Sequence, residues 1–321
     1  MSAADDTAVE RLAAGIVERL GLTVPAVPRL ADLVIDWATA WDRDRNGPDW
    51  LVDNVLARGR GHALYAPHKV GKSLFMLWLA AEMATGPHPV AVLYLDYEMT
   101  LDDVLERLED MGHGPDADLS RLAYWLLPTL PPLNTETGAD VLDQLLDQLA
   151  ETHPGHELAV VIDTTSRAVT GDENDASTIQ AFYEHTGIRL KRRGVTFARL
   201  DHAGKDPGKG QRGSSAKGDD IDLCWKLTRT DSGITLAREL TRINWAPERV
   251  SFDLRLDPLR YDQAEQGYLA GTREVIDLLD ALGVDPDART GEAQAALRAA
   301  GTGRRRALVI DAQRARRRDR T

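Results

Sequence analysis

The 321-residue sequence predicts an α/β fold in which a mostly parallel sheet is flanked by helices and continues into an antiparallel extension. Between residues 51 and 257, apolar strand-like runs alternate with segments of helical periodicity. Several runs are continuously apolar, above all LAVVID at 158–163, as is typical of strands buried on both faces. Beyond Gly218 short turns separate the apolar runs, and this change predicts the antiparallel strands.

The expected elements of the sheet follow one another in a regular order. Strands are expected at 62–65, 91–96, 123–127, 158–163 and 195–201, and helices from Lys72, from Thr100, near 136–152 and near 176–193. The antiparallel strands are expected in IDLCWKLTRT, ITLAREL and RVSFDLRLD, and a turn at residues 231–233 joins the first two.

Two further segments flank the sheet. Residues 1–25 have helical spacing but are separated from the rest by prolines, which predicts either an amphipathic arm or a partly ordered tail. After Tyr261 a polar linker precedes two helical segments, TREVIDLLDALG and GEAQAALRAAG, and an arginine-rich end. The sequence therefore predicts an N-terminal helical arm at 1–50, a sheet domain at 51–260 and a small helical, arginine-rich module at 261–321.

Composition excludes several classes of protein. The net charge of -12 and the isoelectric point near 5.2 argue against a protein that coats nucleic acid by bulk electrostatics. The single cysteine, Cys224, lies in an apolar run and is expected to be an ordinary buried thiol, so disulfides and cysteine metal sites within one chain are excluded. No apolar run is long enough to span a membrane, and the acidic N-terminus lacks the basic start of a signal peptide. A cytoplasmic protein is expected.

A phosphate-binding loop is expected between the strand HALY and the apolar helix that follows it. The eight residues fit the pattern GxxxxGK[ST] with alanine in place of the first glycine. Backbone N–H groups of such a loop and a helix N-terminus form an anion cradle, so the segment predicts binding of ATP with Mg²⁺. Lys72 would contact the β- and γ-phosphates and Ser73 would ligate Mg²⁺. The loop consists of Ala66, Pro67, His68, Lys69, Val70, Gly71, Lys72 and Ser73.

Acidic residues stand at two strand ends. Asp163 closes LAVVID and is expected in the Mg²⁺ water shell. Asp96 and Glu98 follow the strand AVLYLD and share one face of it. Glu98 is the preferred general base and Asp96 the less favoured candidate, while the alternative interpretation makes both of them solvated acids at a strand end.

These motifs together resemble the RecA-like AAA ATPases related to the RepA hexameric helicases of plasmids, phages and other mobile elements. The matching segments lie within residues 58–225 and are, in order, LYAPHKVGKS, VLYLDYEM, VVIDTTSRAVTGDEND, RLDHAGKD and QRGSSAKGDDID. The resemblance implies a RecA-like P-loop ATPase core. It also implies that Glu98 is the catalytic base, that Asp163 is the acid of the second nucleotide-binding motif and that His202 is a polar γ-phosphate sensor.

The resemblance further implies a ring, often a hexamer, in which one subunit supplies an arginine to its neighbour. Arg212, in the basic loop 203–218, is the first choice for this arginine finger, with Arg238 and Arg242 as alternatives. The same loop suits contact with single-stranded DNA, although it has no aromatic residue for base stacking, and it equally fits a solvated loop. A second loop at 164–177 carries Arg167 and is a candidate for lining a central channel.

Between residues 304 and 320 eight arginines stand against two aspartates, a local balance of +6 that fits either a DNA contact or a solvated basic tail. Two functions of different classes fit the whole pattern. One is an ATP-hydrolysing, helicase-like motor that acts on DNA in replication of a mobile element or a chromosome. The other is a nucleotide-dependent regulatory or scaffold ATPase that switches partner binding without translocation. The extended sheet disfavours a third class, a small-molecule kinase.

Overall fold

The computed structural model describes residues 34–42, 48–173, 175–203, 220–264, 269 and 271–318. The chain forms two compact units, residues 1–46 and 47–321, and the second carries the sheet. The arm predicted at residues 1–25 lies outside the described residues. The first unit contains the short helix α3 (Trp37–Ala40), which begins where the Asp36 carboxylate accepts a hydrogen bond from the Ala38 N–H at 3.0 Å.

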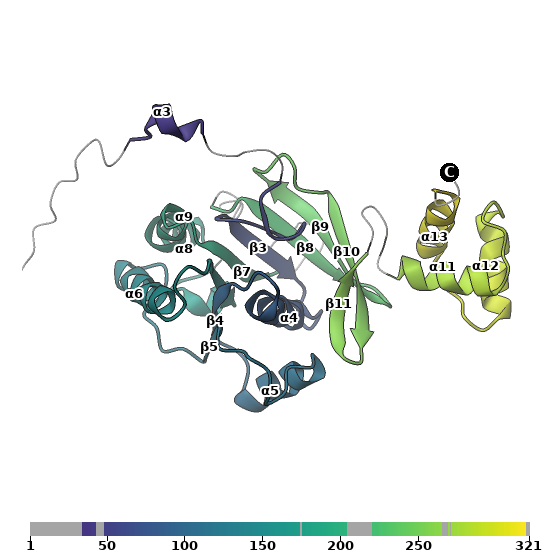
Figure 1. Cartoon of the computed structure of the whole chain (residues 1–321), viewed down its shortest axis with the longest axis horizontal. Helices are drawn as coiled ribbons and strands as arrows, with labels where there is room; N and C mark the ends of the chain where they lie inside the picture. The colour runs from purple at the N-terminus through teal and green to yellow at the C-terminus, as the bar shows by residue number, and fades with distance from the viewer. Residues whose placement is uncertain are drawn as a thin grey trace, which may run out of the picture. The chain divides into compact units, whose positions relative to one another are not determined.

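Nine strands of the described residues form one sheet, with the order β11-β10-β9-β8-β3-β7-β6-β4-β5 (Figure 1). From β8 to β5 every neighbouring pair is parallel, and β8 to β11 pair antiparallel. The predicted fold class is confirmed. In chain order the strands are β3 (Gly61–Ala66), β4 (Ala91–Asp96), β5 (Leu122–Leu126), β6 (Leu158–Asp163), β7 (Thr196–His202), β8 (Leu223–Arg229), β9 (Gly233–Thr241), β10 (Arg249–Leu256) and β11 (Leu259–Gln263).

Helices cover both faces of the parallel strands, which explains why these strands are apolar throughout. In β6, Ala159 and Val161 join the core under α4 (Lys72–Thr85) and α5 (Leu101–Asp110). The alternate residues Val160 and Ile162 join the core on the other face. That face is covered by α6 (Glu136–Thr152), α7 (Thr165–Ala168), α8 (Ala176–Phe182) and α9 (Ile188–Arg192).

Local signals place the helix ends. Thr100 and Asp103 form a capping box at the start of α5, and the Thr135 hydroxyl accepts a hydrogen bond from the Gly138 N–H at the start of α6. The single helix expected near 176–193 is instead three consecutive segments, because the π-helix η1 (Tyr183–Gly187) separates α8 from α9.

A small hairpin that the sequence analysis did not predict precedes the sheet. Its strands, β1 (Trp50–Val52) and β2 (Leu56–Ala57), pair antiparallel. Two buried side chains fix it to the sheet, since Trp225 donates through Nε1 to the Val55 carbonyl at 2.9 Å and His62 accepts through Nε2 from the Ala57 N–H at 2.8 Å. Burial lowers the pKa of His62 to about 4, so the imidazole is neutral in this role at pH 7.

The C-terminal residues form three helices around a core of their own. These are α11 (Thr272–Ala281), α12 (Thr290–Ala299) and α13 (Arg306–Arg318), and the first two were predicted. The arginine-rich end was predicted only as a basic segment and forms the third helix. The shared core includes Val275, Leu279, Leu297 and Val309. In the part of the chain that is described, no helix combines the length and apolar character needed to cross a bilayer.

The hydrogen bond of Trp225 can be tested against a tryptophan that lacks one. Trp225→Phe leaves the Val55 carbonyl without its donor, which should lower the free energy of unfolding by about 1–2 kcal/mol more than Trp78→Phe does. Trp78 is the matched control because it also packs against the core, but its buried Nε1 donates to no acceptor among the described residues. Urea unfolding of both variants measures the difference, and equal losses would show that the Trp225 bond contributes nothing.

Candidate active site

Four parallel strands end at the same edge of the sheet, and their last residues form the floor of the candidate site. Ala66 ends β3 beside His202, which ends β7, and Asp96 ends β4 beside Asp163, which ends β6. All four residues are buried. The carboxyl edge of parallel strands is where ligands bind in open α/β sheets.

The predicted phosphate loop connects β3 to α4 at this edge. Gly71 precedes α4 with a φ of 104°, a conformation that glycine adopts without strain. Ala66, which replaces a glycine of the pattern, is a buried strand residue outside the positive-φ region, so its methyl group is compatible with the loop. Pro67, His68 and Lys69 are exposed, and their backbone lies where an anion can reach it.

Lys72, the first residue of α4, places its amino group among carboxylates. Its side chain is buried, and burial lowers its pKa. Four carboxylates oppose this effect and favour the charged ammonium: Asp163, Glu98, Asp201 and Glu173. The structure therefore brings the predicted lysine and both predicted catalytic acids into one electrostatic cluster.

Asp163 has the surroundings of a residue that holds a cation shell. Its Oδ2 accepts a hydrogen bond from the Tyr94 hydroxyl at 2.9 Å, while Oδ1 is buried and accepts none from the residues that the structure describes. Burial raises the pKa of Asp163 to about 6, against the effect of the Ser73 and Tyr94 hydroxyls. A buried carboxylate oxygen beside a serine hydroxyl is an oxygen donor set that Mg²⁺ and its water ligands fit.

Asp96 and Glu98 have different surroundings, and these separate the two candidates for the base. Asp96 is fully buried and uses both oxygens, since Oδ1 accepts from the N–H groups of Glu98 and Met99 and Oδ2 accepts from the Tyr124 hydroxyl. Glu98 is exposed, and its Oε1 accepts from the Thr164 hydroxyl at 3.3 Å. Asp96 thus shapes the turn that presents Glu98.

His202 lies beside the phosphate loop, as predicted for a sensor. Its ring stacks on that of His68, with the centroids 4.1 Å apart. Burial and the nearby positive charges of Lys72 and His68 lower the pKa of His202, which favours the neutral imidazole. Glu173 acts in the opposite direction on His202 and also on Lys72, although sequence reasoning did not single it out.

A buried ion cluster under the site was also missed. Arg199 of β7 is fully buried and donates through Nε to Asp201 at 3.1 Å and through a second nitrogen to Asp220. Its sequence signal is the pair of opposite charges at alternate positions of the otherwise apolar strand VTFARLD. Because β7 ends at His202 and Asp220 follows residue 219, the cluster joins the two ends of the basic loop.

The candidate arginine fingers are not brought together with this cluster. Arg212 and the rest of 204–219 lie outside the described residues. Arg238 lies on β9, where its guanidinium donates to the Ala246 carbonyl, and Arg242 follows that strand and is exposed. Arg167 is exposed on α7, immediately after the strand that ends at Asp163.

Comparisons with known proteins agree with this geometry. A family model described as an AAA domain matches residues 25–208, more than half of the chain. Among solved structures the chain is similar to one whose title describes an ATPase domain, at 14% identity and a TM-score of 0.56, with 74% of this chain and 100% of that chain covered. This likeness shows the RecA-like fold. The search of curated proteins found no match.

The buried state of Asp163 predicts a site that opposes stability. Because its pKa is raised from 3.8 to about 6, the folded protein binds this proton more tightly than the unfolded chain does. The contribution favours folding most below pH 4 and is lost as the pH rises through 6. Asp163→Asn should therefore raise the free energy of unfolding at pH 7.5, without nucleotide and with EDTA, by up to about 3 kcal/mol.

Asp96→Asn is the matched control for this prediction. An amide nitrogen cannot accept the hydrogen bonds that Asp96 accepts, so this variant should be destabilised by about 1–3 kcal/mol. Thermal unfolding followed by circular dichroism measures both variants. Loss of stability in Asp163→Asn would contradict the electrostatic account of its buried carboxylate.

Proposed function

The chain belongs to the AAA domain family, and from this membership we propose that it is an ATP hydrolase that binds ATP with Mg²⁺ and acts as a DNA-associated, helicase-like motor. One observation carries the hydrolase proposal: Lys72, Glu98 and the open oxygen of Asp163 converge at one edge of the sheet. We retain residues 51–260 as the ATPase domain and 261–321 as a separate module.

In this proposal the phosphates bind to the loop 66–73 and the first turn of α4. The N–H groups of the loop accept the negative charge, and Lys72 contacts the β- and γ-phosphates. Ser73 and the Oδ1 oxygen of Asp163 are the residues that would hold Mg²⁺, which supplies neutralisation of the phosphate charge. The pKa of Asp163 is close enough to 7 for its ionised form to be available there.

Hydrolysis requires a water molecule oriented in line with the γ-phosphate. We assign the orienting role to Glu98, whose carboxylate accepts the water proton as oxygen bonds to phosphorus and the bond to ADP breaks. Thr164 restrains the Glu98 carboxylate and Asp96 restrains its backbone. His202 is assigned to the γ-phosphate as a hydrogen-bond donor, and its lowered pKa makes that donor a neutral N–H.

The remaining parts of the proposal concern partners. An arginine finger such as Arg212 requires a neighbouring subunit, so a homo-oligomer is expected, and a hexamer fits the resemblance to RepA-type helicases. Arg238 and Arg242 remain the alternatives, although Arg238 would first have to release the Ala246 carbonyl. Single-stranded DNA is the proposed substrate of the motor. The alternative is a switch ATPase, which the acidic net charge of -12 favours.

The assignment of Glu98 separates binding from chemistry. Glu98→Gln should lower kcat by about a hundredfold or more, because the base is lost, while ATP affinity stays within a few-fold of the original. Lys72→Ala should lose affinity as well. Steady-state hydrolysis and titration with a fluorescent ATP analogue measure the two quantities.

Glu106→Gln provides the matched control, because Glu106 is exposed on α5 and touches none of these groups. Its kcat should be unchanged. Full activity in Glu98→Gln would move the base to another residue.

The motor and the switch differ in their response to DNA. For a motor, single-stranded DNA should stimulate ATP hydrolysis about tenfold or more, through order imposed on the basic loop and the subunit interface. Hydrolysis is measured with and without an oligonucleotide, with Lys72→Ala as the blank. A rate that DNA does not change would support the switch, and absence of ATP binding would remove the hydrolase proposal.

A further inference from the structure

The helices α11, α12 and α13 form a module that the proposed ATPase chemistry does not use. They pack around a shared apolar core (Figure 1). The six residues 300–305 connect α12 to α13 and include Gly301 at a φ of 72°. A helix, a glycine-containing turn and a second helix supported by a third is the arrangement with which helix-turn-helix proteins present one helix to DNA.

The outer face of α13 is basic. At 100° per residue, the exposed positions fall within about 100° of the helix circumference. Three of them are arginines, Arg306, Arg314 and Arg317, and they surround Ile310, which is 40% exposed. The opposite side, with Leu308, Val309, Ala312 and Ala315, is buried in the module.

The arginines of the module divide into structural and available ones. Arg316 is buried and bonds to Asp280 and to the Val284 carbonyl, and Arg304 bonds to Glu274. Arg306 and Arg314 form no ion pair with any residue that the structure describes. Two cations on one helix face are therefore uncommitted within the module.

Charge is distributed unevenly between the module and the rest of the chain. Residues 271–318 contain ten arginines and seven acidic residues, a net charge of +3. Residues 1–270 contain 28 lysines and arginines and 43 acidic residues, a net charge of -15. A polyanion would be repelled by most of the protein and attracted to this module.

We propose that the exposed face of α13 binds duplex DNA in the major groove, with Arg306, Arg314 and Arg317 on phosphates or base edges. A helix of 13 residues is about 20 Å long and fits the width of that groove. Residues 271–318 contain no aromatic side chain, so they offer no stacking platform for single-stranded bases. The apolar side of α13 is buried, which leaves none for a membrane surface.

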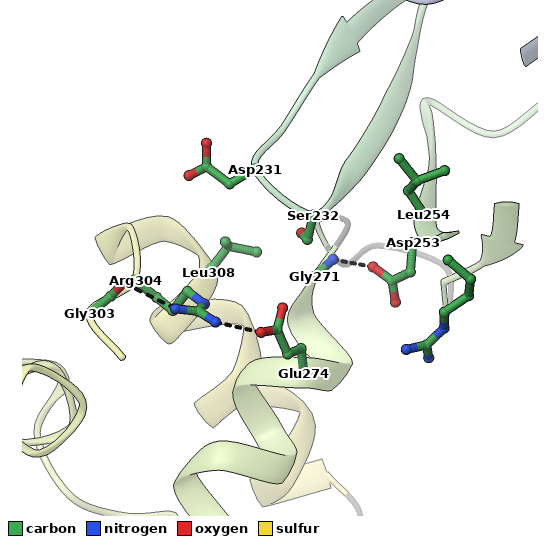
Figure 2. A pocket seen from close by; sticks show the side chains of 10 residues that line it. Asp231, Ser232, Asp253, Leu254, Gly271, Glu274, Gly303, Arg304 and Leu308 are labelled. Carbon is green, nitrogen blue, oxygen red and sulfur yellow. Dashed lines mark hydrogen bonds and ion pairs between the residues drawn. The ribbon is translucent and has the colours of Figure 1, made fainter. Parts of the chain in front are cut away.

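Polar contacts fix this module to the antiparallel end of the sheet. Asp253 of β10 accepts from the Gly271 N–H at the start of α11, and Arg305 bonds to Asp231 of the β8–β9 turn at 3.0 Å. Figure 2 shows Asp231, Asp253 and Glu274 around a cavity of about 300 Å³ between these elements. The duplex would therefore be held at the sheet extension and away from the predicted phosphate loop.

The test measures binding of the full-length chain to a labelled DNA duplex of about 20 base pairs. Fluorescence anisotropy is followed without nucleotide at several salt concentrations, so that failure of the ATPase proposal does not affect the result. Arg306→Ala with Arg314→Ala should weaken binding by roughly one to two orders of magnitude near 0.1 M salt and reduce the salt slope by about 2.

Matched variants control for net charge and folding. Arg255→Ala with Arg260→Ala removes two exposed arginines of the β10–β11 hairpin and should leave binding within about twofold. Arg306→Lys with Arg314→Lys keeps the charges and should retain most of the phosphate-dependent affinity. Circular dichroism of all variants shows whether the module stays folded.

Three outcomes would overturn the proposal. They are absence of duplex binding at low salt, equal loss of binding in the hairpin control, and a preference for a single strand of the same sequence. Binding to an RNA duplex as tight as to DNA would also contradict it, because the major groove of A-form RNA is too narrow for a helix.

Discussion

The buried ammonium of Lys72, surrounded by carboxylates on neighbouring strand ends, is the interaction on which the candidate site depends. Removing a charge from water costs several kcal/mol unless partners compensate for it. Asp163, Glu98, Asp201 and Glu173 compensate here, and Arg199 in turn bonds to Asp201. Acids outnumber cations in this cluster, so a nucleotide that arrives with a divalent cation fits it better than the bare phosphate anion.

This charge arrangement requires the sheet to be parallel at its centre. Parallel strands bring β3, β4, β6 and β7 to one edge, and the helices on both faces make their interiors dry. Polar groups at that edge are then fixed by short bonds of the kind that Asp96 makes to Glu98 and Met99. The apolar strands thus position the site through their ends, while their middles supply the core.

The parts of the structure that follow from periodicity and motif spacing could be predicted from the sequence. β4 and β6 lie where the apolar runs end in acids, and α4 begins at Lys72. The choice of Glu98 over Asp96 needed only strand alternation, but its physical reason, that Asp96 has no free oxygen, is a tertiary contact. Glu173 and Asp220 enter through loop geometry that no local pattern encodes. The helical state of α13 was hidden because its charged residues mask a narrow apolar stripe, and the stripe became visible only against α11 and α12.

The separation of charge gives the two ends of the sheet different relations to a nucleic acid. The acids that hold Lys72 and a cation shell would repel a DNA backbone, so a polynucleotide near the predicted phosphate loop needs local cations such as those of loop 203–218. The module at the other end needs no such compensation, since its outer helix is already basic. A duplex bound there and a single strand bound near the loop would be contacts of different chemistry, the first strongly salt-dependent and supported by a folded helix. The chain is therefore built so that nucleotide chemistry and duplex attachment occupy separate surfaces, and a change in one set of charges can leave the other intact.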